Sequence, residues 1–239
     1  MASSRPVSVR PLYRQVADEF IARIISGEWS QGQPIDNETE IARSLGVSVG
    51  TARKAFDILV EYQLLERQQG RGSVVPELSR GAGRARFSNV RAPCGSRVTG
   101  EVEVRDARVE RPDERAAALL DVAAGTQIVV FDRLRTYRDR VFMTERVFLR
   151  LPGDHDVPGD AEALRRLAEM RWHGFDIATG KSERVGTTRA AAEDAAVFGI
   201  DEGHPVMTLE RVVRSYRGRP LELRLARCVL EPDLVYAAE

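Results

Sequence analysis

The sequence predicts an α+β protein built from two domains of different character. The chain has 239 residues, and a prior of about 150 residues per domain favours two domains. Up to residue 59, apolar residues recur at helical spacing between capping residues, which is typical of short packed helices. From residue 98 onward, runs rich in β-branched residues alternate with short polar turns, which is typical of antiparallel strands. We therefore expect a small, mainly helical domain followed by an α+β domain with a mainly antiparallel sheet.

The composition is that of a globular protein with ample core. Hydrophobic residues make up 43% and charged residues 30% of the chain, and the formal net charge is zero. Binding to a nucleic acid would therefore depend on where individual arginines lie, not on an excess of them. No apolar run has the length of a membrane span, and the first eleven residues lack the apolar core of a signal peptide. Since Cys94 and Cys228 show no metal-like spacing, we expect reduced thiols in a cytoplasmic protein.

The first helix is expected over residues 11–26. Leu12, Val16 and Phe20 recur at i, i+4 spacing and would form its buried stripe. Proline is well tolerated as a first helical residue, and Gly27 follows the last turn, where glycine commonly ends a helix.

Residues 37–59 predict two short helices joined by a sharp turn. Asn37 can cap the first helix, and Glu40 can complete a capping box. Gly46 would end that helix because a positive φ costs glycine little, and Ser48 can cap the second helix. Small alanines on both helices allow the close crossing that a helix-turn-helix requires.

The polar side of the second helix suits the major groove of DNA. Its expected DNA contacts are Ser48, Gly50, Thr51, Arg53 and Lys54. Thr51 can hydrogen-bond a base edge or a phosphate, Arg53 can bind guanine or phosphate bidentately, and Lys54 supplies a point charge. An ordinary helical hairpin with a solvated basic face is the alternative, but the caps, small residues and glycine together favour DNA binding.

Residues 64–75 predict a β-hairpin with a glycine-rich tip, which forms the wing of a winged helix-turn-helix. Its expected DNA contacts are Gln69, Gly70, Arg71 and Gly72. Arg71 would be held where it can reach the minor groove or a phosphate, although a plain surface turn is the alternative. We assign residues 1–76 to the DNA-binding domain, residues 77–97, rich in glycine and arginine, to a linker, and residues 98–239 to the second domain.

The second domain is expected to contain three helices and six strands. The strands are expected at residues 98–109, 127–137, 141–149, 181–189, 206–216 and 220–230, of which the last two and the second and third form hairpins. The helices are expected at residues 112–120, 162–170 and 190–198. This order of elements predicts an α+β domain with a mainly antiparallel sheet.

Residues 11–76 resemble the winged helix-turn-helix of the GntR family of bacterial transcription regulators. The matching motifs are Glu38-Thr-Glu40-Ile-Ala42, Gly46-Val-Ser48, Thr51-Ala-Arg53-Lys-Ala55 and Arg67-Gln-Gln-Gly70-Arg71-Gly72. The resemblance implies that Ser48, Thr51, Arg53, Gln69, Gly70, Arg71 and Gly72 lie at or near DNA. The family usually has arginine where this chain has Thr39, and often where it has Val49. The operator is therefore expected to depart from the common half-site of the family.

The second domain resembles the UTRA effector-binding domain of the HutC subfamily, over about residues 98–236. The matching motifs are Ala118-Leu-Leu-Asp-Val-Ala-Ala-Gly-Thr-Gln, Asp132-Arg-Leu-Arg135, Thr144-Glu145-Arg-Val-Phe-Leu149, Ala195-Ala-Val-Phe-Gly-Ile200 and Gly218-Arg-Pro-Leu-Glu222. The resemblance implies that a small polar or anionic metabolite binds beside the sheet, at Arg133, Arg135, Glu145 and Glu222. The fold is shared with chorismate lyase, so architecture alone leaves an enzyme open.

Strand parity supports a shared face for these residues. Arg133 and Arg135 are two apart on one strand and point to the same face. Two guanidiniums on one face need anions, from protein carboxylates or from a ligand. Arg224 has the parity of Glu222, whereas Arg227 does not, so Arg224 joins the expected effector site. A salt-bridge ladder on a solvated sheet face is the alternative.

These patterns predict a sequence-specific DNA-binding transcription regulator, a repressor released by a small polar or anionic metabolite. A homodimer would place two recognition helices on a pseudo-palindromic operator. His155, His173 and His204 are scattered, which predicts no metal site, and with no nucleophile motif or phosphate loop we expect no cofactor and no enzyme. Two alternatives stay open: a lyase-like enzyme with a regulatory winged helix, and a DNA-binding dimer that binds no effector.

Overall fold

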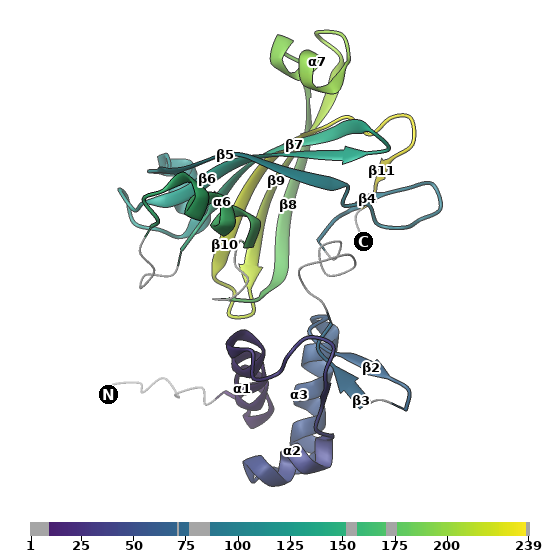
Figure 1. Cartoon of the computed structure of the whole chain (residues 1–239), viewed down its shortest axis with the longest axis vertical. Coiled ribbons are helices and arrows are strands. Elements are labelled where there is room, and N and C mark those ends of the chain that lie inside the picture. Colours follow the sequence, from purple (N-terminus) through teal and green to yellow (C-terminus); the bar gives the residue numbers. More distant parts are fainter. Residues whose placement is uncertain (1–9, 71, 77–86, 152–156, 171–175, 238–239) are drawn as a thin grey trace, which may run out of the picture. The chain divides into compact units, whose positions relative to one another are not determined.

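The chain forms two compact units, residues 1–83 and 84–239. The computed structural model describes residues 10–70, 72–76, 87–151, 157–170 and 176–237. Arg71 and the histidines at 155 and 173 lie outside the described residues, so the predicted contact at the wing tip stays a prediction. Each unit is described by itself below (Figure 1).

The amino-terminal unit contains three helices and a small sheet. The helices are α1 (Leu12–Ser26), α2 (Glu38–Leu45) and α3 (Val49–Glu61). The strands are β1 (Pro34–Ile35), β2 (Glu66–Gln68) and β3 (Gly72–Val74), in the antiparallel order β1-β3-β2. The helix-turn-helix and the wing hairpin are as predicted. Strand β1 was not predicted, because two residues are too few to leave a pattern in the sequence.

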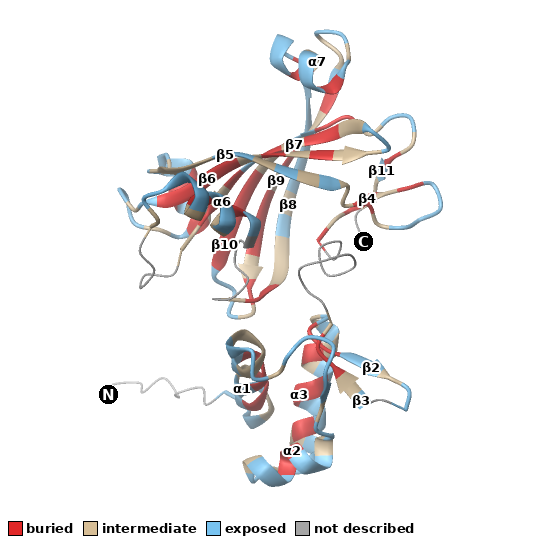
Figure 2. Ribbon diagram, in the orientation of Figure 1, coloured by how far each residue is buried: buried red, intermediate tan, exposed pale blue. Residues whose placement is uncertain are grey.

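Local capping and a small apolar core hold the helix-turn-helix together. The Asn37 side chain accepts hydrogen bonds from the backbone of Thr39 and Glu40, both at 3.0 Å, and the Glu40 carboxylate accepts one from Asn37 N at 3.2 Å. Gly46 ends α2 with a φ of 65°. One face of α3 is buried (Figure 2). The buried core side chains of this unit include Phe20, Ala52, Ala55, Phe56 and Leu59.

Removing the α2 cap should destabilise the amino-terminal unit. Asn37→Ala deletes both side-chain bonds, so we expect the free energy of unfolding to fall by about 0.5–2 kcal/mol. Asn37→Asp is the matched control, because aspartate caps helices about as well as asparagine. Both variants can be compared by denaturation in a Trp172→Phe background, where Trp29 is the remaining tryptophan. Equal midpoints for the two variants would mean that the cap contributes nothing measurable.

The second unit is built on a six-stranded antiparallel sheet of order β5-β6-β7-β10-β9-β8. Its strands are β5 (Glu101–Glu110), β6 (Ile128–Tyr137), β7 (Arg140–Leu149), β8 (Ala178–Arg189), β9 (Pro205–Ser215) and β10 (Pro220–Cys228). Its helices are α5 (Glu114–Leu120), α6 (Ala161–Met170) and α7 (Ala192–Phe198). The α+β class and the two long hairpins agree with the prediction.

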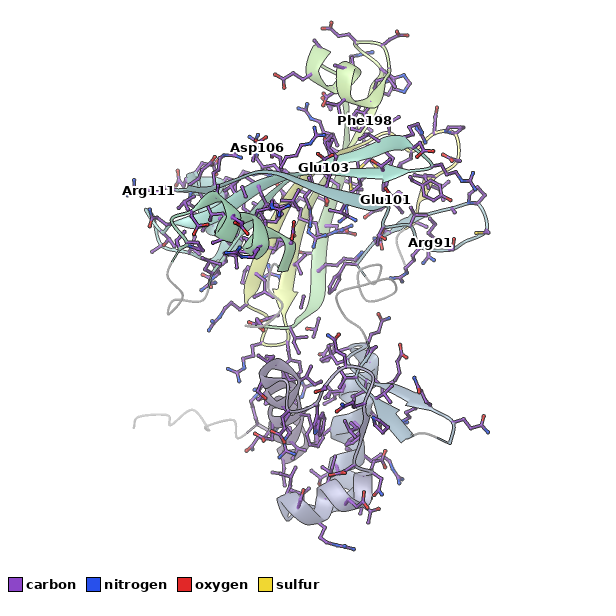
Figure 3. The ribbon with its side chains drawn as sticks, viewed as in Figure 1. Arg91, Glu101, Glu103, Asp106, Arg111 and Phe198 are labelled. Atoms are coloured by element: carbon purple, nitrogen blue, oxygen red, sulfur yellow. The ribbon has the colours of Figure 1, made fainter. Side chains whose placement is uncertain are left out.

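Side-chain alternation gives the sheet two faces with different covers. On one face, Phe131 and Val147 pack in a buried cluster with Leu164 and Ala168 of α6. On the other face, α5 packs on the neighbouring strand positions, which include Val130 and Leu223. Helix α7 carries Phe198, which is buried in a cluster with Val206 and Val229. Phe198 is labelled in Figure 3. We call the first of these surfaces the α6 face.

The second unit begins before residue 98, which corrects the predicted extent of the linker. Phe87 is 8% exposed and Val90 1% exposed, within the unit that starts at residue 84. Strand β4 (Val90–Arg91) pairs with β11 (Val235–Tyr236). The prediction failed because this stretch holds few apolar residues, and its strand partner lies at the other end of the chain. We call residues 87–97 the strap.

Candidate functional site

The amino-terminal part of α3 presents the predicted polar residues to solvent. Ser48 caps the helix, since its Oγ accepts a hydrogen bond from Thr51 N at 3.1 Å and lies 2.9 Å from Thr51 Oγ1. Gly50, Arg53 and Lys54 are exposed and Thr51 is half-buried. This end of α3 therefore has a free polar surface of the kind that enters the major groove.

Arg53 is held by a residue that the sequence interpretation missed. Its Nε donates to Glu38 Oε2 at 2.8 Å, and Arg67 Nη2 donates to Glu38 Oε1 at 3.2 Å and to Asp57 Oδ1 at 2.7 Å. The hydrogen bond to Glu38, together with its charge, raises the pKa of Arg53. The available signal was the presence of opposite charges on the three elements, with Glu38 on α2, Arg53 on α3 and Arg67 on the wing.

The remaining predicted DNA contacts lie on α3 and the wing. Lys54 Nζ stands 5.7 Å from the centre of the Tyr13 ring, a cation–π distance. Gln69, Gly70 and Gly72 are exposed, and the two glycines have φ of 76° and 81°, so both need the left-handed backbone that favours glycine. A groove of about 930 Å³ runs between α2 and the wing, with Glu38, Arg67 and Gln69 among its lining residues.

The five predicted effector residues meet in one buried cluster on the α6 face. The ion pairs are Arg133–Glu145 at 3.0 Å, Arg133–Glu222 at 3.5 Å, Arg135–Glu145 at 2.6 Å, and Arg224–Glu222. None of the five is more than 8% exposed. The alternative of a solvated salt-bridge ladder is therefore wrong. Arg227 lies on the opposite face, where it pairs with Asp194 at 2.6 Å, as strand parity predicted.

The charges of this cluster are strongly coupled. Burial alone would raise the pKa of Glu145, but Arg133, Arg135 and Arg224 together hold it well below its usual range. The carboxylate is therefore ionised, and each of its arginine neighbours depends on it for compensation. Removing one partner from such a set leaves an uncompensated charge in the interior.

Sequence reasoning missed the extension of this cluster toward the sheet edge. Arg211 is 3% exposed, pairs with Glu183 and faces Arg224 across the β9–β10 ladder. Glu183 also accepts hydrogen bonds from Tyr236 OH at 2.6 Å and from Asn89 Nδ2 at 2.7 Å. The available signal was a charged residue at an inward position of β9, between Leu209 and Val213.

A small cavity separates the cluster from the strap. Among the described residues, three arginines line it, namely Arg135, Arg211 and Arg224, together with Phe87 and Ser88 of the strap, and no carboxylate does. Its volume is about 10 Å³, which is about the space of one water molecule.

Several buried polar atoms of the cluster lack a hydrogen-bond partner among the described residues, namely Arg133 Nε, Glu145 Oε1 and Arg224 Nη2. Buried polar groups without partners are costly to a fold. The cluster therefore has unused capacity to bind a polar group.

The described residues show no sign of a metal site. No group of three or more His, Cys, Asp or Glu side chains among them could hold a metal ion. Burial raises the pKa of Cys228 to about 12, so this thiol is protonated at neutral pH. Within the same residues, no helix combines the length and the apolar character needed to span a bilayer.

Two models of known protein families match the chain, one within each of its two units. Residues 12–75 match the model of bacterial regulatory proteins of the gntR family, and residues 97–231, more than half of the chain, match the UTRA domain.

Individual relatives agree with these matches. The HTH-type transcriptional repressor NagR of Bacillus subtilis is 26% identical over 217 residues, which cover 89% of this chain and 88% of NagR. The mannosyl-D-glycerate transport/metabolism system repressor MngR of Escherichia coli is 43% identical over 68 residues, 28% of each chain. A solved ligand-binding domain, assigned to a GntR-family transcriptional regulator of Bordetella bronchiseptica, superposes with a TM-score of 0.55 at 20% identity. It covers 65% of this chain and 98% of its own, and supports the fold of the second unit.

These relatives are transcription regulators and not enzymes, which excludes the lyase-like alternative. The chain belongs to the GntR family of DNA-binding transcription regulators, in the HutC subfamily that joins a helix-turn-helix domain to a UTRA domain.

Proposed function

We propose that this protein is a cytoplasmic repressor that binds its operator as a homodimer and is released by a small anionic metabolite. The effector would bind in the arginine cluster of the α6 face, through Arg133, Arg135 and Arg224 with Glu145 and Glu222. The proposal depends on one observation above all: among the described residues, three buried arginines and no carboxylate line the cavity, and Arg224 Nη2 has no hydrogen-bond partner.

The charges of the cluster favour an anion over a neutral ligand. Four buried arginines, Arg133, Arg135, Arg211 and Arg224, face the carboxylates of Glu145, Glu183 and Glu222. A carboxylate or a phosphate would supply the missing negative charge, and arginine binds both bidentately. Glu145 and Glu222, which pair with these arginines, would orient hydroxyl or amino groups of the same ligand.

The strap offers a physical link between this site and DNA binding. A cavity of about 10 Å³ cannot hold a metabolite, so a ligand must displace some of the residues that enclose the cavity. Phe87 and Ser88 of the strap are among these residues. These residues follow directly on the stretch that joins the two units. A ligand that favours a displaced strap by about 1–3 kcal/mol would change operator affinity by the same amount.

Screening anionic metabolites by thermal shift and by loss of operator binding tests this proposal. A true effector should raise the melting temperature, because it binds only the folded state, and should weaken operator binding. Arg135→Lys keeps the charge that Glu145 needs but loses the planar fork, so we expect it to bind DNA normally and to need at least tenfold more effector. Arg146→Lys is the control, since Arg146 pairs with Asp132 on the sheet face opposite to the arginine cluster, and its side chain is 55% exposed.

The outcomes separate the competing ideas. If no anion alters either melting temperature or operator affinity, the second unit serves only to dimerise and the effector proposal is wrong. If Arg135→Lys and Arg146→Lys respond to the effector alike, the ligand binds elsewhere.

A further inference from the structure

We infer that Glu38 is a positioning residue for DNA recognition, which sets the geometry of Arg53 on α3 and of Arg67 on the wing. The inference rests on the proposed DNA surface and assigns a role to a residue outside it. Glu38 would mainly increase the ratio of the affinity for the operator to the affinity for other DNA, and would change the overall affinity less.

One carboxylate joins the two arginines from different elements. Glu38 is the first residue of α2, Arg53 lies on α3 and Arg67 on β2. Each carboxylate oxygen takes a different arginine, Oε2 the Nε of Arg53 at 2.8 Å and Oε1 the Nη2 of Arg67 at 3.2 Å. The Glu38 side chain is 24% exposed, whereas those of Arg53 and Arg67 are 64% and 52% exposed. The carboxylate is therefore the inner member and the guanidiniums are the outer ones.

The contact leaves the recognition chemistry of Arg53 intact. Glu38 takes only the Nε of Arg53, so the two terminal amino groups stay available for a guanine edge or a phosphate. A fixed Nε also removes rotamers from the free protein, which lowers the entropy lost when the side chain binds DNA. Such preorganisation favours the duplex whose bases match the fixed position.

The negative charge of Glu38 also works against unspecific binding. A carboxylate near the DNA surface repels phosphates, and phosphate contacts supply nearly all of non-specific affinity. At the operator this repulsion is offset because Arg53 and Arg67 remain between Glu38 and the DNA. The repulsion therefore lowers the affinity for other DNA more than the affinity for the operator, and this difference is a gain in specificity.

The test compares a matched pair of variants on two duplexes. One duplex is selected from a random library by the wild-type protein, and the other is a shuffled duplex of the same composition. Glu38→Gln should bind the selected duplex about tenfold more weakly, while its affinity for the shuffled duplex stays equal or rises. Glu40→Gln removes the same charge from the same helical turn, and glutamine still completes a capping box. It should leave the ratio of the two affinities unchanged.

A double-mutant cycle with Arg53→Ala separates positioning from a structural role. If Glu38 acts through Arg53, then Glu38→Gln should weaken operator binding much less in the Arg53→Ala background than alone. Equal ratios for Glu38→Gln and Glu40→Gln, or an equal loss on both duplexes, would overturn the inference. If instead Arg53→Ala itself leaves operator binding unchanged, the DNA surface is misplaced; the proposed function fails only if the library returns no enriched duplex.

Discussion

Replacing Arg53 with alanine is expected to weaken operator binding about 10- to 100-fold, which corresponds to about 1–3 kcal/mol for one bidentate base contact. Arg53 is exposed on the amino-terminal half of α3 and is held at its Nε by Glu38. Alanine is a good helix former, so the unit should stay folded. The ratio of specific to non-specific affinity should fall together with the affinity.

Fluorescence anisotropy with the selected duplex, over a range of salt concentrations, measures this effect. Arg111→Ala is a suitable control, because Arg111 is an exposed arginine of the second unit and its loss changes the net charge equally. If the two variants bind the operator alike, Arg53 contributes charge and not recognition, and the surface on α3 would have to be abandoned.

Replacing Glu145 with alanine is expected to destabilise the second unit by about 3–5 kcal/mol, the range for breaking a buried ion pair on one side. Arg133 and Arg135 both pair with this carboxylate, at 3.0 Å and 2.6 Å, and both would be left buried without it. The loss is large enough to unfold a marginally stable unit. Asp132→Ala is the control, since it breaks an ion pair with Arg146, whose side chain is 55% exposed, and exposed pairs contribute about 0–1 kcal/mol.

Acid should also remove the stabilisation that Glu145 gives to the second unit. Because the pKa of Glu145 is held well below its ordinary value of 4.5, its stabilising effect is complete above about that pH and is lost as the pH falls further. Urea titrations of wild type and both variants at neutral and acid pH measure this directly. A Glu145→Ala midpoint equal to that of Asp132→Ala would show that the cluster relaxes at little cost.

The helix-turn-helix was predictable because its signals are local. Asn37, Gly46 and Ser48 fix the helix ends within a few residues of sequence, and the structure uses all three in those roles. The network around Glu38 is different, since it joins residues 15 and 29 positions apart. No periodicity within one element reports such a contact.

For the proposed effector site, strand parity predicted which residues share a face but not that this face is buried. Alternation along the strands placed Arg133, Arg135 and Arg224 on one side, and the structure agrees. Whether that side meets water depends on α6 and on the strap, which are distant in the chain. The strap has the sequence character of a linker because β4 pairs with β11, which lies more than a hundred residues later in the chain.

The central claim is that α3 reads a particular DNA sequence and that two copies of it act together. Selection of duplexes from a random library by the wild-type protein, with sedimentation of the selected complex, tests this most directly. We expect an enriched inverted repeat that is bound by two protomers, with its half-site centres about one helical turn, or a multiple of a turn, apart. A library that returns no enriched sequence, or a complex with one protomer on an asymmetric site, would contradict it.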